Sequence, residues 1–322
     1  MFAWIGSIFM WCAIISFVTY LINTLIHEVI AKEQNLKTKY NAKWALVTGG
    51  SSGMGKAIAE KLAQQKINVV IVSLDDQLLK DTTQELRTKF PQVEFRSVGV
   101  NLGQPGFLPE VIEATKDIDI SLLFNNAGYV TPGLFFDVSL ERQMNNYHCN
   151  VTAAVLLTHH FLRLMGEKNL KGLITFTSSS GMFLPTPTMT LYGCTKAFLT
   201  SFAASLAPEA RAIGVDVLAI HPSPTRTRFY DNAQGVQMLS FAQRIAVEPS
   251  EVADCLFKNA GRVVVIDQGL TSIGLKMLTK IIDGNFISLL FPFIPHLMED
   301  FNKALNDWNK NLKERLAAPV AK

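Results

Sequence analysis

The chain has 322 residues, of which 48% are hydrophobic and 18% are charged, and its formal net charge at pH 7 is +3. This length predicts one sizeable globular domain with an attached segment rather than two small domains. The weak charge, with no basic run interleaved with aromatics, excludes the usual pattern of a nucleic-acid-binding protein. The four cysteines show no CxxC or paired spacing, so no disulfide framework and no metal site are predicted.

An uncharged stretch, residues 2–26, lies at the N-terminus. At about 1.5 Å per residue, a helix of this length spans a bilayer core of about 30 Å. Trp4 and Tyr20 lie towards its ends, where amphipathic rings favour the membrane interface. A cleaved signal peptide would need a basic start, a shorter apolar core and a small-residue cleavage site, none of which is evident. We therefore expect residues 1–30 to form an uncleaved transmembrane anchor.

Basic residues after this stretch predict its orientation. They are Lys32, Lys37, Lys39 and Lys43. Because cytoplasmic flanks carry the excess of positive charge, we expect a single-pass topology with the main domain in the cytosol. Residues 31–42 are polar and are interpreted as a linker.

From residue 43 onward, short β-rich runs alternate with longer helical ones. The runs are continuous in Val, Ile and Leu, which is typical of strands buried on both faces. The strand candidates are 44–48, 68–73, 93–100, 120–126, 172–178, 215–220 and 262–267, with helices over 55–65 and 77–90. The alternation predicts an α/β fold, a doubly wound parallel sheet of Rossmann type, over residues 43–268. Residues 269–322 are expected to form a C-terminal helical extension.

A glycine-rich loop, "TGGSSGMG", lies between the first strand and the first helix of this domain. Gly49, Gly53 and Gly55 allow a tight turn and a close approach of the backbone to a pyrophosphate at the positive end of the helix. A glycine-rich loop alone is weak evidence, but its place between strand and helix favours dinucleotide binding.

Three motifs in order resemble those of the short-chain dehydrogenase/reductase family. "TGGSSGMG" is similar to its TGxxxGxG loop, "NNAG" (125–128) to its motif after the fourth strand, and "YGCTK" (192–196) to its YxxxK. The resemblance covers about residues 42–267. It implies an NAD(P)-dependent oxidoreductase acting on an alcohol or a carbonyl group.

The pair Tyr192 and Lys196 lies one helical turn apart. Tyr-x-x-x-Lys is common by chance, and the other two motifs give it meaning. An ammonium beside a phenol favours the phenolate, so the pKa of Tyr192 is expected to fall from its free value of about 10. The resemblance implies that Tyr192 is the general acid/base and that Lys196 also binds the nicotinamide ribose.

Two further catalytic residues are implied by the resemblance. The family's serine, a second donor to the carbonyl oxygen, lies thirteen residues before its tyrosine, which gives Ser179. Its neighbours Ser178 and Ser180 are interpreted as polar residues at a strand end. The family's asparagine, which holds a water in a proton relay, corresponds to Asn150. The nearby alternatives, Asn145 and Asn146, are expected to face solvent.

The resemblance also implies which residues hold the cofactor. They come from the glycine-rich loop, the ends of later strands and the YxxxK pair: Gly49, Ser51, Ser52, Gly53, Met54, Gly55, Ser73, Asn101, Leu102, Asn126, Ala127, Gly128, Tyr192, Lys196, Pro222 and Thr227. Two positions depart from the family's pattern. Asn101 replaces the usual Asp, and Ser223 replaces the Gly that follows Pro222.

Cofactor choice is usually set at the end of the second strand, by an Asp for NAD or an Arg for NADP. Here Ser73 and Leu74 hold these places, and Ser52 in the loop is likewise not basic. Asp75 and Asp76 follow at about the distance of an NAD-type acid, or begin the next helix. Since membrane-bound relatives favour NADPH, we expect NADP(H), with NAD(H) as the alternative.

The lead-in to the first strand and the "LPTPTMTLYGCTKAF" run resemble a membrane-anchored branch. It contains very-long-chain 3-oxoacyl-CoA reductases and 17-beta-hydroxysteroid dehydrogenases, and it implies an endoplasmic reticulum membrane location. The expected function is NADPH-dependent reduction of a lipid ketone, first a 3-oxoacyl-CoA of fatty-acid elongation. The alternatives are 3-ketodihydrosphingosine or a steroid as substrate, and, in another class, a non-catalytic anchored dinucleotide-binding protein.

The expected partners are an apolar lipid or steroid carbonyl compound, the membrane and, as a candidate homodimer, a second copy of the chain. In the extension, residues 269–283 are expected to be an apolar-rich helix and the C-terminal end a polar helix. Residues 285–297 are too short to span a bilayer and are interrupted by Pro292 and Pro295. They are interpreted as a flap packed on the domain or as a lip that dips into the membrane.

Overall fold

The computed structural model describes residues 2–233 and 237–317. Its centre is one seven-stranded sheet in the order β3-β2-β1-β4-β5-β6-β7, with every neighbouring pair parallel. The strands are β1 (Trp44–Thr48), β2 (Asn68–Ser73), β3 (Phe95–Gly99), β4 (Ile120–Asn125), β5 (Gly172–Thr177), β6 (Val215–Pro222) and β7 (Val265–Gln268). The doubly wound Rossmann-type sheet expected from the sequence is confirmed, and the chain order reverses direction between β1 and β4.

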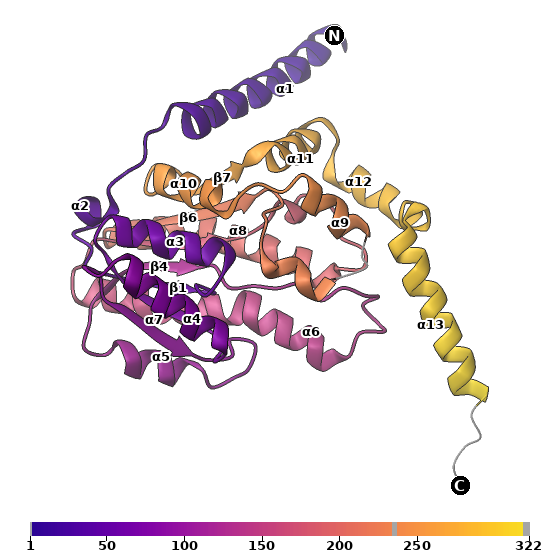
Figure 1. The fold of residues 1–322 in the computed structure, drawn as a ribbon. Helices are drawn as coiled ribbons and strands as arrows, with labels where there is room; N and C mark the ends of the chain where they lie inside the picture. The colour runs from indigo at the N-terminus through magenta and orange to yellow at the C-terminus, as the bar shows by residue number, and fades with distance from the viewer. Residues whose placement is uncertain (1, 234–236, 318–322) are drawn as a thin grey trace.

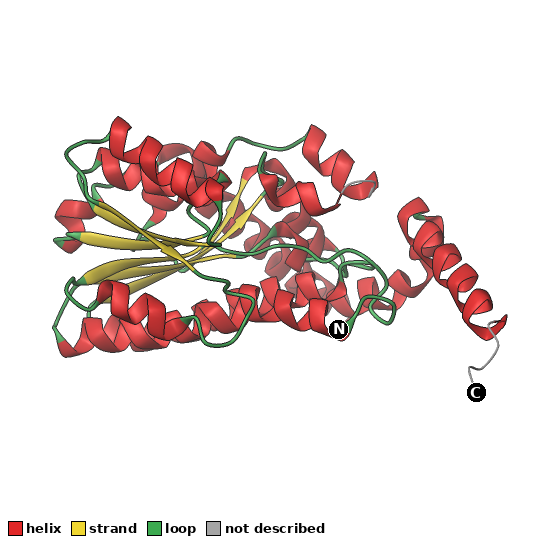
Figure 2. Cartoon of the chain, turned by 60° about the horizontal axis from the view of Figure 1, so that its bottom comes forward, coloured by secondary structure: helices red, strands yellow, loops and turns green. Residues whose placement is uncertain are grey.

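Helices cover both faces of the sheet (Figure 2). One face packs against α3 (Gly53–Gln64), α4 (Gln77–Lys89) and α10 (Pro249–Asn259). The other packs against α5 (Leu108–Thr115), α7 (Ala153–Glu167) and α8 (Thr190–Ala212). Continuous apolar strands such as β1 and β4 are buried on both faces because each face has its own helical layer.

The observed strand ends differ from the expected ones by a few residues. β3 begins at Phe95 rather than at residue 93, and β7 begins at Val265 rather than at residue 262. Arg262 instead closes a turn, where its backbone N–H donates to the carbonyl of Asn259. The carboxyl ends differ less, as in β6, which ends at Pro222 rather than at residue 220; parallel sheets of this type bind ligands at these ends.

The segment expected to be a linker is only partly one. Within residues 31–42, α2 (Leu36–Tyr40) is a short helix that buries Leu36 and Tyr40 in the core beside α3. The Tyr40 hydroxyl donates to Asp216 Oδ2 at 2.8 Å. Polar composition suggested a free linker, but two apolar anchors in it are enough to fix the segment on the domain.

The N-terminal helix α1 (Phe2–Thr24) continues through a π-helical turn (Leu25–Ile30) and extends beyond the sheet layers (Figure 1). Within the described residues, 10–30 is the one helical stretch long and apolar enough to cross a membrane. Its later part touches the domain, because the Tyr20 hydroxyl donates to Asp267 Oδ2 at 2.9 Å. Further along, His27 pairs with Asn259.

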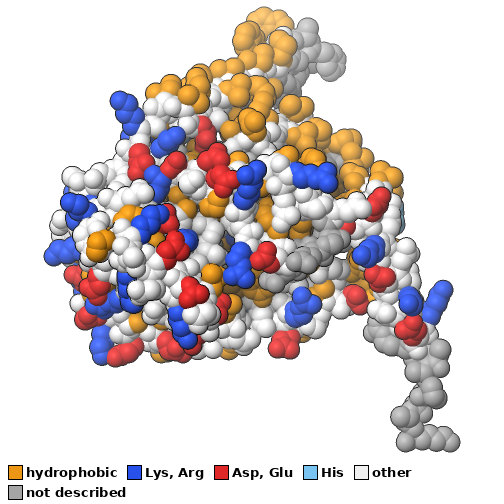
Figure 3. All heavy atoms as spheres, viewed as in Figure 1, with side chains coloured by type: hydrophobic (Ala, Val, Ile, Leu, Met, Phe, Trp, Pro, Cys, Tyr) orange, Lys and Arg blue, Asp and Glu red, His pale blue; other side chains and the backbone are white. Residues whose placement is uncertain are grey.

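The C-terminal extension is helical, as expected. It contains α11 (Gly269–Ile281), α12 (Gly284–Leu290), two 3-10 turns (Phe291–Phe293 and Pro295–Leu297) and α13 (Glu299–Ala317). Smaller helices before it are α6 (Leu140–Tyr147) and α9 (Gln237–Arg244). Figure 3 shows hydrophobic side chains gathered along α1 and over α11 and α12, on one side of the molecule.

Candidate active site

The glycine-rich loop turns from β1 into α3 with almost no space for side chains. A Cβ on Gly55 would lie 2.2 Å from the carbonyl oxygen of Gly49, and one on Gly53 would lie 2.7 Å from Thr227 Cγ2. Gly49 and Gly53 have φ values of 64° and 52°, which favour glycine. Ser52 precedes α3 without a side-chain cap, so the first N–H groups of α3 stay available. This cradle fits the pyrophosphate of a dinucleotide.

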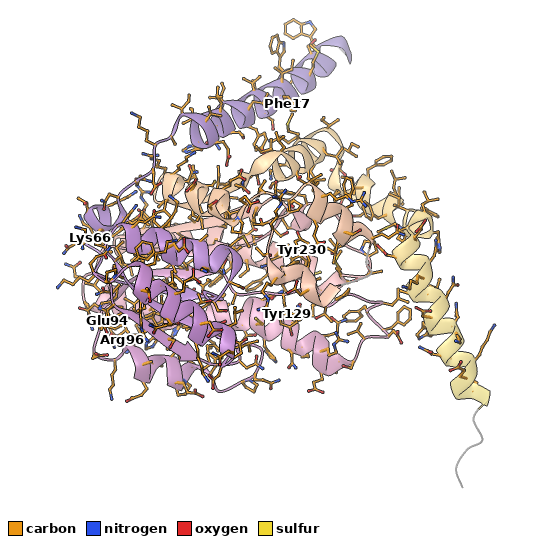
Figure 4. The ribbon with its side chains drawn as sticks, in the orientation of Figure 1. Phe17, Lys66, Glu94, Arg96, Tyr129 and Tyr230 are labelled. Atoms are coloured by element: carbon orange, nitrogen blue, oxygen red, sulfur yellow. The ribbon has the colours of Figure 1, made fainter. Side chains whose placement is uncertain are left out.

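The NNAG segment is tied to the end of β1. Thr48 Oγ1 accepts hydrogen bonds from the backbone N–H of Asn126 at 2.9 Å and of Ala127 at 3.0 Å. The Asn126 amide in turn donates to the Thr48 carbonyl at 3.1 Å. These bonds hold the two loops that follow β1 and β4 side by side, where the sheet order reverses. Figure 4 shows Tyr129, just after this segment, and Tyr230 at this end of the sheet, with Lys66 and Glu94 at the opposite end.

The YxxxK pair lies in the first turns of α8. Lys196 Nζ donates to the Thr177 carbonyl at 2.8 Å and lies 5.6 Å from the centre of the Tyr192 ring. Burial lowers the pKa of Lys196 to about 8. Burial also raises the pKa of Tyr192 to about 12, against a lowering by its hydrogen bond with Ser179. The expected fall of the Tyr192 pKa is therefore wrong, because burial raises this pKa more than the hydrogen bond with Ser179 lowers it.

Ser179 lies beside Tyr192, as expected. A Cβ on Gly181 would lie 3.4 Å from Ser179 Oγ and 3.7 Å from Tyr192 Cε1, so both side chains border the same space. Ser179 Oγ accepts from the Gly181 backbone N–H at 3.0 Å. Ser178 lines the same cavity, but its hydroxyl donates to the Lys196 carbonyl at 2.7 Å, which fixes the strand end against α8.

Asn150 lies in a π-helical turn (His148–Thr152) between α6 and α7. Such turns within α-helices are frequent at functional sites. Its side chain bridges the backbone of Tyr129, accepting from the N–H and donating to the carbonyl, both at 3.1 Å. A Cβ on Gly128 would lie 3.1 Å from Asn150 Oδ1 and 3.2 Å from Lys196 Nζ. Asn150 therefore closes the site behind the lysine. Asn146, expected to face solvent, is fully buried and donates to the Tyr129 carbonyl.

Two cavities meet at this point. A groove of about 300 Å³ runs along the glycine-rich loop and contains most of the expected cofactor residues: Gly49, Ser51, Ser52, Gly53, Met54, Ser73, Asn126, Ala127, Gly128 and Thr227. A deeper cavity of about 410 Å³ holds Ser179, Tyr192, Lys196 and Pro222. Met54 and Gly128 line both, so the two spaces adjoin.

Three expected cofactor residues, Gly55, Asn101 and Leu102, do not line either cavity. Gly55 lies inside the turn, where an added Cβ would be 2.2 Å from the Gly49 carbonyl oxygen. Asn101 is exposed, and its Oδ1 accepts from the Gly103 backbone N–H at 2.9 Å, so its side chain caps its own turn. Leu102 is buried in the core of the α5, α7 and α8 side. Asp76, one of the two acids considered for NAD, accepts from the Leu79 N–H at 2.9 Å and caps α4.

Sequence reasoning missed several residues of the site. Arg228 follows Thr227 directly and, among the described residues, is the one basic side chain in the cofactor groove. Its Nε donates to Asp231 at 3.1 Å. The deeper cavity is lined by residues of the C-terminal extension, Leu275, Phe291, Ile294 and Met298. The apolar pattern of that extension was visible, but nothing in the sequence brings it to the catalytic pair.

The three motifs thus lie around two adjoining cavities, and the comparison with known proteins decides what they mean. Residues 43–238 match the short chain dehydrogenase family. The chain belongs to this family. It is therefore an oxidoreductase.

Individual members of the short chain dehydrogenase family show the range of its relatives. The very-long-chain 3-oxoacyl-CoA reductase-B of Danio rerio is 27% identical over 229 residues, which cover 70% of this chain and 73% of the relative. A 7beta-hydroxysteroid dehydrogenase structure has a TM-score of 0.71 and 26% identity, covering 79% of this chain and 98% of that one. A short-chain dehydrogenase from Sphingobium yanoikuyae in complex with NADPH has a TM-score of 0.63 and 28% identity. The match covers 70% of this chain and 87% of that one.

Proposed function

We propose that this chain is a membrane-anchored, NADPH-dependent reductase of an apolar ketone. The observation that carries the proposal is the deeper cavity, in which Ser179, Tyr192 and Lys196 are set in an otherwise largely apolar wall. Lys196 is the one charged residue among the described residues that line it. Such a space binds a hydrophobic molecule and aligns a single polar group in it, the carbonyl, with the catalytic residues.

The proposed cofactor is NADP(H). The cradle formed by Gly49, Gly53 and Gly55 and the start of α3 would hold its pyrophosphate. At the end of β2, Ser73 donates to or accepts from Ser51 at 2.8 Å, and no carboxylate replaces it. Arg228 is the basic side chain of the same groove and a candidate partner for the extra phosphate of NADPH, although it pairs with Asp231, which lines the groove as well. The relative from Sphingobium yanoikuyae binds NADPH, which further supports this choice.

The proposed roles follow from these positions. When bound, the cofactor supplies the hydride. The Ser179 hydroxyl donates to the substrate's carbonyl oxygen, and Tyr192, which is protonated at neutral pH, gives that oxygen its proton. Lys196 would hold the ribose of the bound cofactor and would stabilise the phenolate that remains on Tyr192. Asn150 positions the Tyr129 backbone behind the lysine and is proposed to hold the water that returns the proton.

The first substrate proposed is a 3-oxoacyl-CoA, because the Danio rerio relative bears that activity in its name. A steroid or sphingoid ketone is the second, and the near absence of charged lining residues favours it. The location proposed is the endoplasmic reticulum membrane, with the catalytic domain in the cytosol. A non-catalytic binding protein is less well supported, since Asn150, Ser179, Tyr192 and Lys196 all surround one site.

The experiment is cofactor oxidation by the detergent-solubilised protein with a long-chain 3-oxoacyl-CoA. NADPH and NADH are offered separately, and Tyr192→Phe is the control, because it removes the acidic proton and keeps the ring. We expect turnover with NADPH that falls at least a hundredfold in the variant. Turnover only with a steroid or sphingoid ketone would move the proposal to the second substrate class. No turnover with any of them would support the binding protein.

A further inference from the structure

A second cavity adjoins the catalytic one on the side of the C-terminal extension. It has a volume of about 670 Å³ and lies between α8, the loop 182–187 and α12 with its following turns. Small residues face it from both helices: Gly193, Cys194 and Ala197 from α8, and Gly284 and Ser288 from α12. Because these side chains are short, the two helices leave a groove between them.

The groove and the catalytic cavity share a wall. Phe291 and the loop residues Leu184, Pro185, Thr186 and Pro187 line both spaces. The loop is fixed on α8, because a Cβ on Gly193 would lie only 2.3 Å from Thr186 Oγ1. Phe291 belongs to the 3-10 turn after α12 and is half-buried, so its side chain borders both spaces together with the loop.

The chemistry of the groove indicates an apolar occupant. None of the described residues that line it is charged. Two of its hydroxyls already have partners within the protein: Thr186 Oγ1 donates to the Met189 carbonyl at 3.1 Å, and Ser288 Oγ donates to the Gly284 carbonyl at 2.9 Å. Few polar groups are therefore left to recognise a polar ligand, whereas an alkyl chain needs none.

We propose that this groove binds the alkyl tail of the ketone substrate, with the chain passing Phe291 while the carbonyl lies at Tyr192 and Ser179. The inference rests on the proposed reductase function and specifies its substrate as a long, flexible lipid rather than a compact polycyclic ketone. Each methylene placed in the groove strengthens binding about fourfold. The groove is thus a chain-length determinant outside the catalytic residues.

The test compares 3-oxohexanoyl-CoA with 3-oxohexadecanoyl-CoA as substrates of the detergent-solubilised full chain. Ser288→Trp fills the groove from α12. Leu289→Trp is the matched control, because Leu289 is the next residue on the same helix, is 64% exposed and lines neither cavity. We expect Ser288→Trp to raise KM for the long substrate at least tenfold, with both kinetic constants for the short one within twofold. Leu289→Trp is expected to leave both substrates unchanged.

A second variant and a second measurement keep the proposal open to refutation. A Cβ on Gly284 meets nothing within 4 Å, so Gly284→Leu enters the groove without a clash and serves if Ser288→Trp does not fold. Equilibrium dialysis of tritiated hexadecan-2-one reports binding without turnover, and a tenfold weaker Kd in either filled variant is expected. An unchanged Kd and KM, or equal losses for short and long substrates, would overturn the inference. Loss of all turnover in the unmodified chain, with the dialysis result intact, would instead count against the reductase proposal alone.

Discussion

Proton affinity in the site depends on burial more than on the spacing of two residues in the sequence. Lys196 is enclosed by Thr177, Gly128 and Asn150, and its pKa falls to about 8. Tyr192 is also shielded from solvent, so its pKa rises to about 12 and its hydroxyl stays protonated at neutral pH. A protonated tyrosine is the form that a ketone reductase needs, since it must give a proton.

The depressed pKa of Lys196 predicts a pH dependence. Below about pH 8 the ammonium is charged and can donate to the ribose, and above it the neutral amine is a weaker donor. We therefore expect kcat/KM for ketone reduction to be level at neutral pH and to fall as pH rises through about 8. Steady-state kinetics across this pH range measures the fall. The variant Lys196→Arg stays charged, so its kcat/KM should not fall through about pH 8, whatever its overall rate. A level profile in the unmodified chain through and beyond pH 8 would refute the assignment.

At the scale of elements, the site is made by loops that parallel strands bring to one edge. The turn between β1 and α3 is so tight that Gly55 packs against the Gly49 carbonyl, and Thr48 ties the next loop to it. The π-helical turn between α6 and α7 likewise fixes the position of Asn150 through the conformation of the backbone. Backbone conformation, rather than side-chain chemistry, therefore sets the shape of the cofactor groove.

Gly55→Ala tests this role of the backbone. Its methyl group would lie 2.2 Å from a carbonyl oxygen, so the loop must shift, and we expect the Kd for NADPH to rise at least tenfold. Gly274→Ala is the matched control, because Gly274 lies in α11 with nothing within 4 Å of the added Cβ. It should leave NADPH binding unchanged and stabilise the helix by about 0.5–1 kcal/mol. Fluorescence titration with NADPH and thermal unfolding give the two readouts, and equal affinities in the two variants would contradict the cradle.

At the scale of the whole molecule, α1 is both apolar and attached to the domain. Tyr20 donates to Asp267, whose other oxygen pairs with the buried His221 at 2.6 Å, and Lys280 donates to Ser16. The described side chains earlier in α1 are largely exposed, and α11 and α12 add hydrophobic residues on the same side. The N-terminal helix, α11 and α12 therefore form one apolar side of the protein, and α12 also lines the groove proposed to bind the alkyl tail.

Vesicle flotation tests the membrane role proposed for α1. The full chain is expected to float with phosphatidylcholine vesicles. Trp11→Lys with Ile15→Lys places two charges on one exposed face of α1, at a cost of about 2.5 kcal/mol each in a bilayer centre, and should reduce the bound fraction at least tenfold. Leu140→Lys with Met144→Lys is the control, because these exposed residues have the same spacing on α6. Equal flotation of both double variants would show that α1 is not the anchor.

Much of this molecule was predictable from local patterns. Buried strands are continuous in Val, Ile and Leu, as β2 and β4 show, and such runs do not depend on which strand lies next to them. The family motifs were likewise visible as short strings, and the structure brings Asn150, Ser179, Tyr192 and Lys196 around one site. Asn101 and Leu102 were predicted to contact the cofactor, but neither lines the cavities. A side chain that caps its own turn, as Asn101 does, cannot be distinguished in sequence from one that binds adenine.

The sequence by itself determined the fold class, from the alternation of strands and helices, and the family, from its resemblance to three motifs in order. The roles of Tyr192 and Lys196 were predicted from that resemblance. Only the tertiary structure decided the proton affinities of Tyr192 and Lys196, since burial depends on every element packed around them. It also decided that Phe291, in the C-terminal extension, lines the same cavity as Tyr192, and that α2 and Tyr20 fasten the N-terminal segment to the domain. Contacts between segments far apart in the chain leave no periodic pattern, so no local reading of the sequence could have found them.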